Sequence, residues 1–216
     1  MKNRVDITGL LKWGLVAGCL LGSAHSAAAF ELKPYKDRLF AYPRTLQSKD
    51  GGDYRSVDYR ELRDINGRDQ IPEKRVKRKY IDYGARRATR QASLSTQAGT
   101  ISYFFAGNTR APRVVTVYIH GIGGNGKQGV NDHSFGGNFN RIKTLMLKNN
   151  GLYLSPDAEA YGAGVAQRIS AVIQKHTRNV GNRRVILACG SQGGEICHRL
   201  ADNATIAPQL AGILFL

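Results

Sequence analysis

The sequence predicts an α/β fold: an open, mostly parallel sheet with helices on both of its faces. Two apolar runs carry this prediction, RVVTVYIH at 113–120 and RRVILAC at 183–189. Continuous runs of this length, bounded by proline or glycine, are typical of central strands that are buried on both faces. Helical periodicity lies between and after the two runs, and strands that alternate with helices indicate a parallel sheet.

Shorter patterns predict the remaining elements. QASLS and TISYFFA alternate polar and apolar residues around a turn at 96–99, which predicts an antiparallel hairpin before the first buried strand. Periodicity and stop signals predict four more elements: a helix at 139–151, a strand at 152–154, a helix at 195–203 and a last strand at 210–216.

A second long helix is expected to begin at Ser155. Ser155 suits the N-cap, Pro156 suits the first turn, and Asp157 interacts favourably with the positive end of the helix dipole. The buried stripe of this helix is predicted to comprise Val165, Ile169, Val172 and Ile173.

Residues 1–29 have the three-part layout of a secretory signal peptide. Basic residues precede the apolar stretch WGLVAGCLLGSA, and small residues follow it, which suits cleavage after Ala29. We therefore expect a secreted or periplasmic protein. A lipoprotein attached through Cys19 and an uncleaved membrane anchor are the alternatives.

The chain is strongly basic, with 32 Lys and Arg against 16 Asp and Glu and a formal charge of +16. Because exported proteins seldom meet nucleic acid, we expect no nucleic-acid partner and consider an anionic envelope surface instead. Eight of the basic residues lie at 73–90, where a solvated arm is favoured over a binding patch. Three regions are predicted: a signal peptide at 1–29, an irregular basic arm at 30–89 and an α/β core at 90–216.

The segment VILACGSQGGEICHRLAD places a serine between a strand and a helix. Small residues, Cys189 and Gly193, lie two positions before and two positions after Ser191. A nucleophile elbow needs this order, because backbones pass closely at its strained turn, which leaves the serine at a helix N-terminus. The usual pattern is G-x-S-x-G, and Cys189 departs from it. An ordinary corner, whose serine only caps the helix, is the alternative.

The turn HGIGGNGKQ at 120–128 has two interpretations. From Gly121 it approaches the phosphate-binding loop G-x-x-x-x-G-K-[ST]. Position 128 is Gln, however, and the loop-like stretch VNDHSFGGNF follows where a helix should begin. From His120 it is the HG turn of an oxyanion hole. We therefore expect the turn to serve an oxyanion, with Lys127 as a solvated loop residue.

With these two motifs in this order, residues 90–216 resemble the α/β-hydrolase superfamily, and GSQGG is most similar to the elbows of carboxylesterases, cutinases and related lipases. The resemblance implies that Ser191 is the nucleophile and that the backbone N–H groups of Ile122 and Gln192 form the oxyanion hole. It also implies four supporting residues, of which the first braces the oxyanion loop: His120, Gly121, Gly190 and Gly193.

A serine nucleophile needs a general base and an acid that orients the base. In the family's order both follow the nucleophile, yet only 25 residues come after Ser191, ending in LAGILFL. Asp202 is too close to Ser191 to be the usual acid. We therefore expect a C-terminally truncated chain whose acid and histidine lie beyond residue 216, and a 216-residue form that is inactive or poorly folded.

Other titratable residues receive weaker predictions. Asp132 and His133 follow the glycine-rich turn, where solvation is favoured over a place at the substrate mouth. His176 is expected to be structural, and His198 is expected to be a surface or packing residue. No cofactor is implied, and no metal is expected because no ligand spacing occurs. Cys189 and Cys197 are near enough for a disulfide, although none is expected.

The predicted function is hydrolysis of a small-molecule or lipid carboxylic ester, of esterase or lipase type, through a Ser191 acyl-enzyme. Thioesterases, peptidases and acyltransferases share this machinery, and neither specificity nor oligomeric state is readable from the sequence. The rival hypothesis is a non-catalytic envelope-binding protein of the same fold that uses residues 73–90 on anionic surfaces.

Overall fold

The computed structural model describes residues 32–33, 44–64, 69–70, 75–178 and 184–216. The predicted signal peptide, with its cleavage site at Ala29 and the alternative lipid attachment at Cys19, lies outside these ranges and remains a prediction. Every helix within the described ranges is too short or too polar to span a bilayer.

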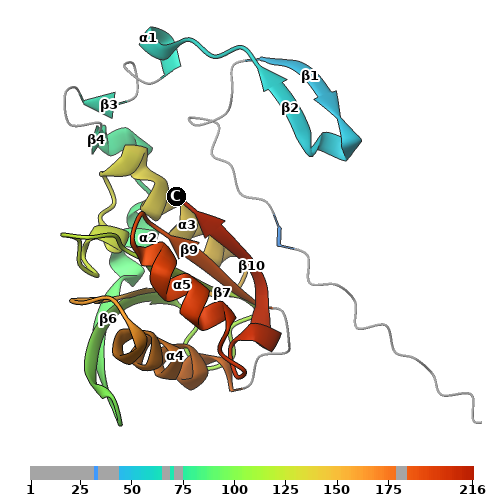
Figure 1. Cartoon of the computed structure of the whole chain (residues 1–216). Helices are drawn as coiled ribbons and strands as arrows, with labels where there is room; N and C mark the ends of the chain where they lie inside the picture. Colours follow the sequence, from blue (N-terminus) through green and yellow to red (C-terminus); the bar gives the residue numbers. More distant parts are fainter. Residues whose placement is uncertain (1–31, 34–43, 65–68, 71–74, 179–183) are drawn as a thin grey trace, which may run out of the picture. The chain divides into compact units, whose positions relative to one another are not determined.

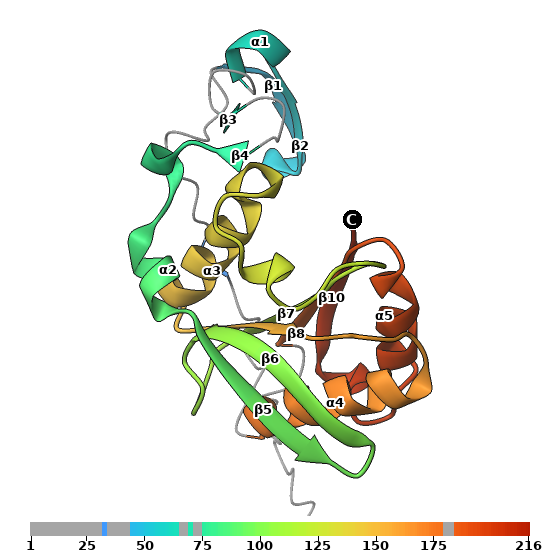
Figure 2. The same cartoon turned by 90° about the vertical axis from the view of Figure 1, so that its left-hand side faces the viewer.

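The largest sheet of the described residues has six strands (Figures 1 and 2). Its strands in chain order are β5 (Arg90–Thr96), β6 (Gly99–Gly107), β7 (Val115–Ile119), β8 (Leu152–Pro156), β9 (Val185–Cys189) and β10 (Leu210–Phe215). Their order in space is β5-β6-β8-β7-β9-β10. The strands from β8 to β10 run parallel, whereas β6 is antiparallel to both β5 and β8. The predicted mostly parallel sheet with an antiparallel start is confirmed.

Helices cover both faces of this sheet (Figure 2). They are α2 (Tyr83–Ala88), α3 (Asn138–Lys148), α4 (Ala163–Thr177) and α5 (Gly193–Ala201). Neighbouring residues of β7 show the division between the faces. Val117 belongs to the apolar cluster shared with α4 and α5, whereas the ring of Tyr118 lies 4.5 Å from the ring of Phe139 on α3.

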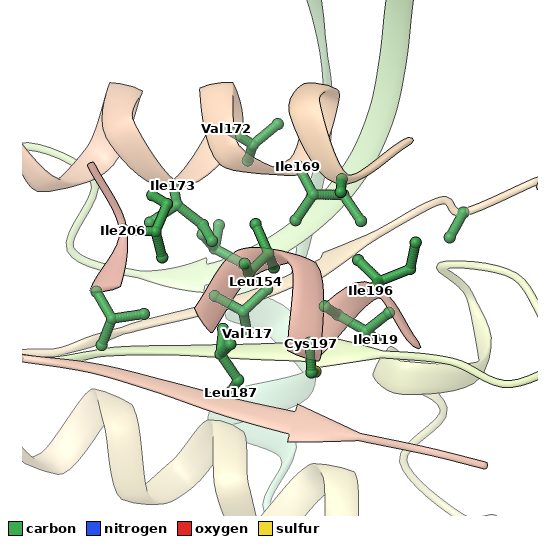
Figure 3. Close-up of a cluster of buried hydrophobic side chains, with 14 of the residues drawn as sticks. Val117, Ile119, Leu154, Ile169, Val172, Ile173, Leu187, Ile196, Cys197 and Ile206 are labelled. Atoms are coloured by element: carbon green, nitrogen blue, oxygen red, sulfur yellow. The ribbon is translucent and has the colours of Figure 1, made fainter. Parts of the chain in front are cut away.

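The main apolar core lies between the sheet and helices α4 and α5 (Figure 3). Three of the four residues predicted as the buried stripe of α4, Ile169, Val172 and Ile173, are fully buried there, and Val165 is 4% exposed. They meet strand residues such as Val117 and Leu154. Each aliphatic side chain buried in this way contributes about 1.5–3 kcal/mol.

The helix predicted to begin at Ser155 begins instead at Ala163. Strand β8 continues through Ser155 and Pro156, which are both buried. The Ser155 hydroxyl donates to the carbonyl oxygen of Gly126 at 2.9 Å, and the Asp157 carboxylate accepts from the Gly126 N–H at 2.9 Å. The capping prediction is wrong because both side chains bind the loop that follows β7.

The region predicted as an irregular arm contains short elements. These are β1 (Thr45–Lys49), β2 (Tyr54–Val57), α1 (Glu61–Asp64), β3 (Asp69–Gln70) and β4 (Arg75–Val76), with 3-10 turns at Asp50–Gly52 and Arg78–Tyr80. Strands β1 and β2 pair in an antiparallel hairpin, as do β3 and β4. Further 3-10 turns occur in the core at Gln128–Val130, Phe135–Gly137 and Ala207–Gln209.

Residues 75–89 differ from a solvated arm, because they are bonded to the core. The Val76 N–H donates to the carbonyl oxygen of His133 at 2.9 Å. Asp82 caps α2, and its carboxylate also accepts from the hydroxyl of Thr144 on α3 at 3.1 Å. Three apolar residues of the segment are buried, namely Val76, Ile81 and Ala85.

Candidate active site

Ser191 occupies the corner between β9 and α5. Its backbone φ is +47°, in the left-handed region where a non-glycine residue is strained. Its N–H donates to the carbonyl oxygen of Leu216 at 3.0 Å, and its own carbonyl oxygen accepts from the Gly194 N–H at 3.0 Å. The residue is exposed. A strained strand-to-helix turn that presents a serine to solvent is the geometry of a nucleophile elbow.

Two glycines allow the end of β7 to pass close to this corner. A Cβ added at Gly193 would lie 2.5 Å from the carbonyl oxygen of Ile119 and 2.7 Å from that of His120. A Cβ added at Gly121 would lie 2.9 Å from the Cβ of Ser191. Real Cβ atoms do not approach other atoms so closely, so both positions need glycine for this contact.

The amides predicted to form an oxyanion hole belong to the residues directly after Gly121 and Ser191. Within the described residues, neither the Ile122 N–H nor the Gln192 N–H has a hydrogen-bond partner. Gln192 is also the N-cap residue of α5 and makes no side-chain capping bond. The positive end of this helix therefore faces the site, where it favours developing negative charge.

His120 is buried at the end of β7 and holds the glycine turn in place. Its Nε2 accepts a hydrogen bond from the Ala158 N–H at 2.9 Å, so the ring carries its proton on Nδ1. Nδ1 lies 2.9 Å from the carbonyl oxygen of Gly121 and donates to it. Because both ring nitrogens have backbone partners, His120 joins the turn to the chain after β8.

Gly190, the last of the four supporting residues to be placed, continues the pairing of β9 with β7, since its N–H donates to the carbonyl oxygen of Ile119 at 2.8 Å.

The structure does not support the phosphate-binding interpretation of the turn at 120–128, because no α-helix begins directly after Lys127. A 3-10 turn at Gln128–Val130 follows Lys127, which is exposed, and α3 begins only at Asn138.

A pocket of about 580 Å³ opens beside Ser191. Its lining is mainly apolar and aromatic, from Tyr118, Ile122, Phe135, Phe139, Ile142 and Leu216. Three polar side chains also line it: Gln128, Asn138 and Arg141. The centroids of the Phe135 and Phe139 rings lie 5.4 Å apart, and the rings meet edge-on. Burial raises the pKa of Tyr118, which packs on the same ring cluster. An apolar pocket with a few polar groups suits a small organic ligand.

A larger cavity of about 1120 Å³ lies between the β5–β6 hairpin, α4 and the segment at 203–209. Its lining is rich in amides and hydroxyls, with Lys175 and Arg178 as its charged groups. Ser191 and the glycine turn are not among its lining residues. We therefore place the candidate site at the smaller pocket, where the strained serine is.

A general base for Ser191 is not found among the described residues. Each described histidine has a partner other than Ser191. His120 bonds to the backbone of Gly121 and Ala158, and His133 bonds to the carbonyl oxygen of Val76. His176 bonds to the Tyr103 hydroxyl, and His198 stacks on the ring of Phe215. The described residues also contain no group of three or more His, Cys, Asp or Glu arranged to hold a metal ion.

Asp132 is not a solvated loop residue, and neither it nor His133 lines the pocket beside Ser191. The Asp132 carboxylate accepts from Lys143 Nζ at 2.8 Å and from the Asn140 side chain at 2.7 Å. The Lys143 side chain is fully buried. Burial lowers the pKa of Lys143, and the hydrogen bond to Asp132 opposes that shift. This ion pair joins the loop at 130–133 to α3.

Cys189 and Cys197 form a disulfide, which corrects the expectation that they would not. The bond joins the last residue of β9 to the second turn of α5, across Cα atoms 6.4 Å apart. Sequence spacing alone did not settle whether the two Cβ atoms point toward each other. Cys189 is also the position at which the elbow departs from the usual glycine.

The strained serine lies at the end of β9, and the glycine turn that packs against it lies at the end of β7, the neighbouring parallel strand. The two unpartnered amides belong to these two corners. The described residues have an α/β-hydrolase fold. No family model matches this chain, and no curated protein matches it.

Solved structures of similar fold include several hydrolases. A carboxyl esterase from Bacillus coagulans is 14% identical with a TM-score of 0.43, over 59% of this chain and 44% of that protein. An epoxide hydrolase from Acinetobacter nosocomialis is 13% identical with a TM-score of 0.43, over 59% and 38%. A haloalkane dehalogenase variant from Bradyrhizobium elkanii is 16% identical with a TM-score of 0.40, over 59% and 40%. This chain spans less than half the length of each.

Proposed function

We propose that the protein is a serine hydrolase that cleaves a carboxylic ester through an acyl-enzyme on Ser191. The observation that carries the proposal is the positive φ of Ser191 at a corner against which Gly121 packs. A capping serine needs no such strain, because an ordinary N-cap residue has extended backbone angles. Strain of this kind persists where the surrounding structure enforces it, which is characteristic of active sites.

In the proposed reaction, Ser191 Oγ attacks the ester carbonyl carbon while a general base takes the hydroxyl proton. The carbonyl oxygen becomes an oxyanion and accepts hydrogen bonds from the Ile122 and Gln192 N–H groups. Each donor of this kind stabilises the transition state by about 3–4 kcal/mol. Collapse of the tetrahedral intermediate expels the alcohol, and water then releases the acid from the acyl-enzyme.

The general base and its orienting acid are proposed to come from outside the described residues. His120 cannot serve, because its Nε2 accepts from a backbone amide and Nδ1 donates to a carbonyl oxygen. A serine without a base keeps little of its catalysis, so the base is a requirement of the proposal.

The pocket beside Ser191 favours an ester with an apolar acyl or alcohol part. Its aromatic side chains, Tyr118, Phe135 and Phe139, present a large apolar surface next to the serine. Esterase or lipase activity is therefore preferred to peptidase activity, since a peptide substrate would need polar partners for its backbone. Thioesters and acyl acceptors other than water use the same serine chemistry and are distinguished by substrate competition.

Export is proposed from the signal-like N-terminus, and the disulfide supports it. Structural disulfides form and persist in oxidising compartments and are rare in cytosolic proteins. Both sulfur-bearing residues are buried, with 1% exposure for Cys189 and 0% for Cys197. A disulfide inside the core is consistent with a protein that completes folding after secretion.

Contact with an anionic envelope surface is the second candidate function. It is favoured by the way residues 75–90 bury their apolar side chains on the core while five cations remain exposed: Arg78, Lys79, Arg86, Arg87 and Arg90. Cosedimentation with anionic vesicles at increasing salt tests it. Binding that weakens with salt and with Lys79→Glu/Arg87→Glu supports this function, and salt-independent binding or no binding rejects it.

The hydrolase proposal is tested with a fluorophosphonate probe on the product of the complete gene. Labelling is expected in the wild type and should be absent in Ser191→Ala. Gly164→Ala, on α4 far from the site in the chain, serves as the matched control and should label normally. Protection by esters, thioesters or peptides identifies the substrate class. Labelling that persists in Ser191→Ala would reject the proposed nucleophile.

A further inference from the structure

We infer that the Cys189–Cys197 disulfide positions the nucleophile corner, so that Ser191 reaches full reactivity only after this bond has formed. The inference rests on the proposed function of Ser191 and concerns how that residue is held. The bond closes the chain around residues 190–196, which contain the whole corner and the first turn of α5.

The Cys189–Cys197 disulfide acts as a clamp between β9 and α5. The sheet holds the β9 side of this clamp in place. Cys189 lies opposite Ile119 of β7 and Phe215 of β10 in the parallel register. Its carbonyl oxygen accepts from the Leu216 N–H at 2.8 Å, and the carbonyl oxygen of Leu216 accepts from the Ser191 N–H at 3.0 Å. The backbone that leads into Ser191 is therefore held by two neighbouring strands, β7 and β10.

The helix side of the clamp is fixed by Cys197. This residue belongs to the apolar core together with Ile196, and both are 0% exposed (Figure 3). At the start of the same helix, Gly193 sits against the carbonyl oxygens of Ile119 and His120 with no space for a side chain. A small shift of α5 away from β9 would loosen this contact and move the Gln192 N–H.

Ser191 lies between these two fixed sides with a φ of +47°. A strained residue keeps such an angle only while its surroundings enforce it, and relaxation would turn the side chain away from the oxyanion donors. The disulfide is the covalent connection that keeps strand and helix at the spacing the strain needs. In the usual elbow a glycine occupies the position of Cys189, so this chain carries an additional restraint there.

Formation of the clamp is a redox step. The two thiols lose two protons and two electrons to a disulfide-bearing oxidant, which is reduced to a dithiol as the new S–S bond forms. Because both sulfurs are buried, later exchange with external thiols is slow, and the bond is set during folding. A chain that folds in a reducing compartment therefore carries two thiols and a weakly reactive serine.

The test compares wild type, Cys189→Ala/Cys197→Ala and Ile196→Val as products of the complete gene. Ile196→Val removes core volume from the same helix and keeps the disulfide. All three are labelled with a fluorophosphonate probe at a temperature where circular dichroism shows each to be folded. We expect the double variant to lose about 10- to 100-fold in the maximal inactivation rate, with the half-saturating probe concentration unchanged. Amide exchange at residues 191–194 should quicken in the double variant alone.

A folded double variant that labels at the wild-type rate would overturn the inference and leave the proposed function intact. Absence of labelling in the oxidised wild type would overturn the proposed function, and the clamp with it. If the double variant does not fold, wild-type protein folded under reducing conditions takes its place. Full reactivity of that folded, reduced protein would also overturn the inference.

Discussion

Gly121 lies so close to Ser191 that a Cβ at position 121 would come within 2.9 Å of the serine Cβ and 3.0 Å of the carbonyl oxygen of Gly190. Gly121→Ala should therefore push the oxyanion turn away from the serine. We expect fluorophosphonate labelling to slow by about 100-fold or more, the cost of losing one oxyanion donor. Unchanged labelling of the folded variant would show that the Ile122 amide plays no part.

Gly193 and Gly194 are adjacent in α5 but differ in what surrounds them. A Cβ at Gly193 would meet two backbone oxygens, whereas one at Gly194 would meet only the Phe215 ring at 3.6 Å. Gly193→Ala should lower the free energy of unfolding by about 1–3 kcal/mol. Gly194→Ala should be neutral or stabilising by up to about 1 kcal/mol. Urea unfolding of both variants measures this, and equal effects would contradict the close approach of β7 and α5.

The buried ion pair of Lys143 with Asp132 should matter far more than a surface pair. Lys143→Met removes the buried cation of Asp132 and leaves this nearly buried carboxylate only the exposed Arg86 guanidinium at 3.9 Å, which costs about 3–5 kcal/mol of folding free energy. Arg199→Met, which breaks the exposed pair with Glu195, should change it by less than about 1 kcal/mol. Chemical denaturation compares the two. A mild effect of Lys143→Met would mean that water or Arg86 compensates the charge of Asp132.

Because of His176, we expect the free energy of unfolding to decrease at mildly acidic pH. Burial lowers the pKa of His176 below its usual 6.5, opposed by the Thr109 carbonyl and assisted by Lys175. Below pH 6.5 the unfolded chain therefore binds a proton more readily than the folded one, so the free energy of unfolding decreases as pH falls through this window. His176→Gln should flatten that decrease between pH 7 and 5. Identical pH slopes for variant and wild type would reject this origin.

The 216-residue chain should show almost no esterase turnover, because no described histidine is bonded to Ser191. We expect its hydrolysis of p-nitrophenyl butyrate to remain near the uncatalysed rate and to be unchanged in Ser191→Ala. Turnover that is fast and lost in Ser191→Ala would show that a base reaches the serine from within these residues.

The sequence predicted those parts of the molecule whose signals are local. The runs that became β7 and β9 are continuous apolar stretches, and the corner at Ser191 is marked by small residues at fixed offsets. These signals depend on neighbours within a few positions, so the mostly parallel sheet and the strand-to-helix corner were predictable.

Features that depend on long-range contacts were missed. Ser155 has every local property of a helix cap, yet its hydroxyl binds the carbonyl oxygen of Gly126, 29 residues away. Asp132 sits in a glycine-rich loop that suggested solvation, yet its carboxylate contacts Lys143 and Asn140 of α3. The helix α2 did carry a usable signal, since Asp82 precedes it as a typical N-cap. The disulfide depends on the distance between Cys189 and Cys197 in the fold, which spacing alone does not give.

The central claim, that two backbone amides converge beside a reactive serine, is tested most directly by a crystal structure of the phosphonylated product of the complete gene. We predict phosphorus bonded to Ser191 Oγ, with the phosphoryl oxygen about 2.7–3.1 Å from both the Ile122 and the Gln192 backbone nitrogen atoms. An adduct on another residue, or a phosphoryl oxygen directed into solvent away from these amides, would contradict it.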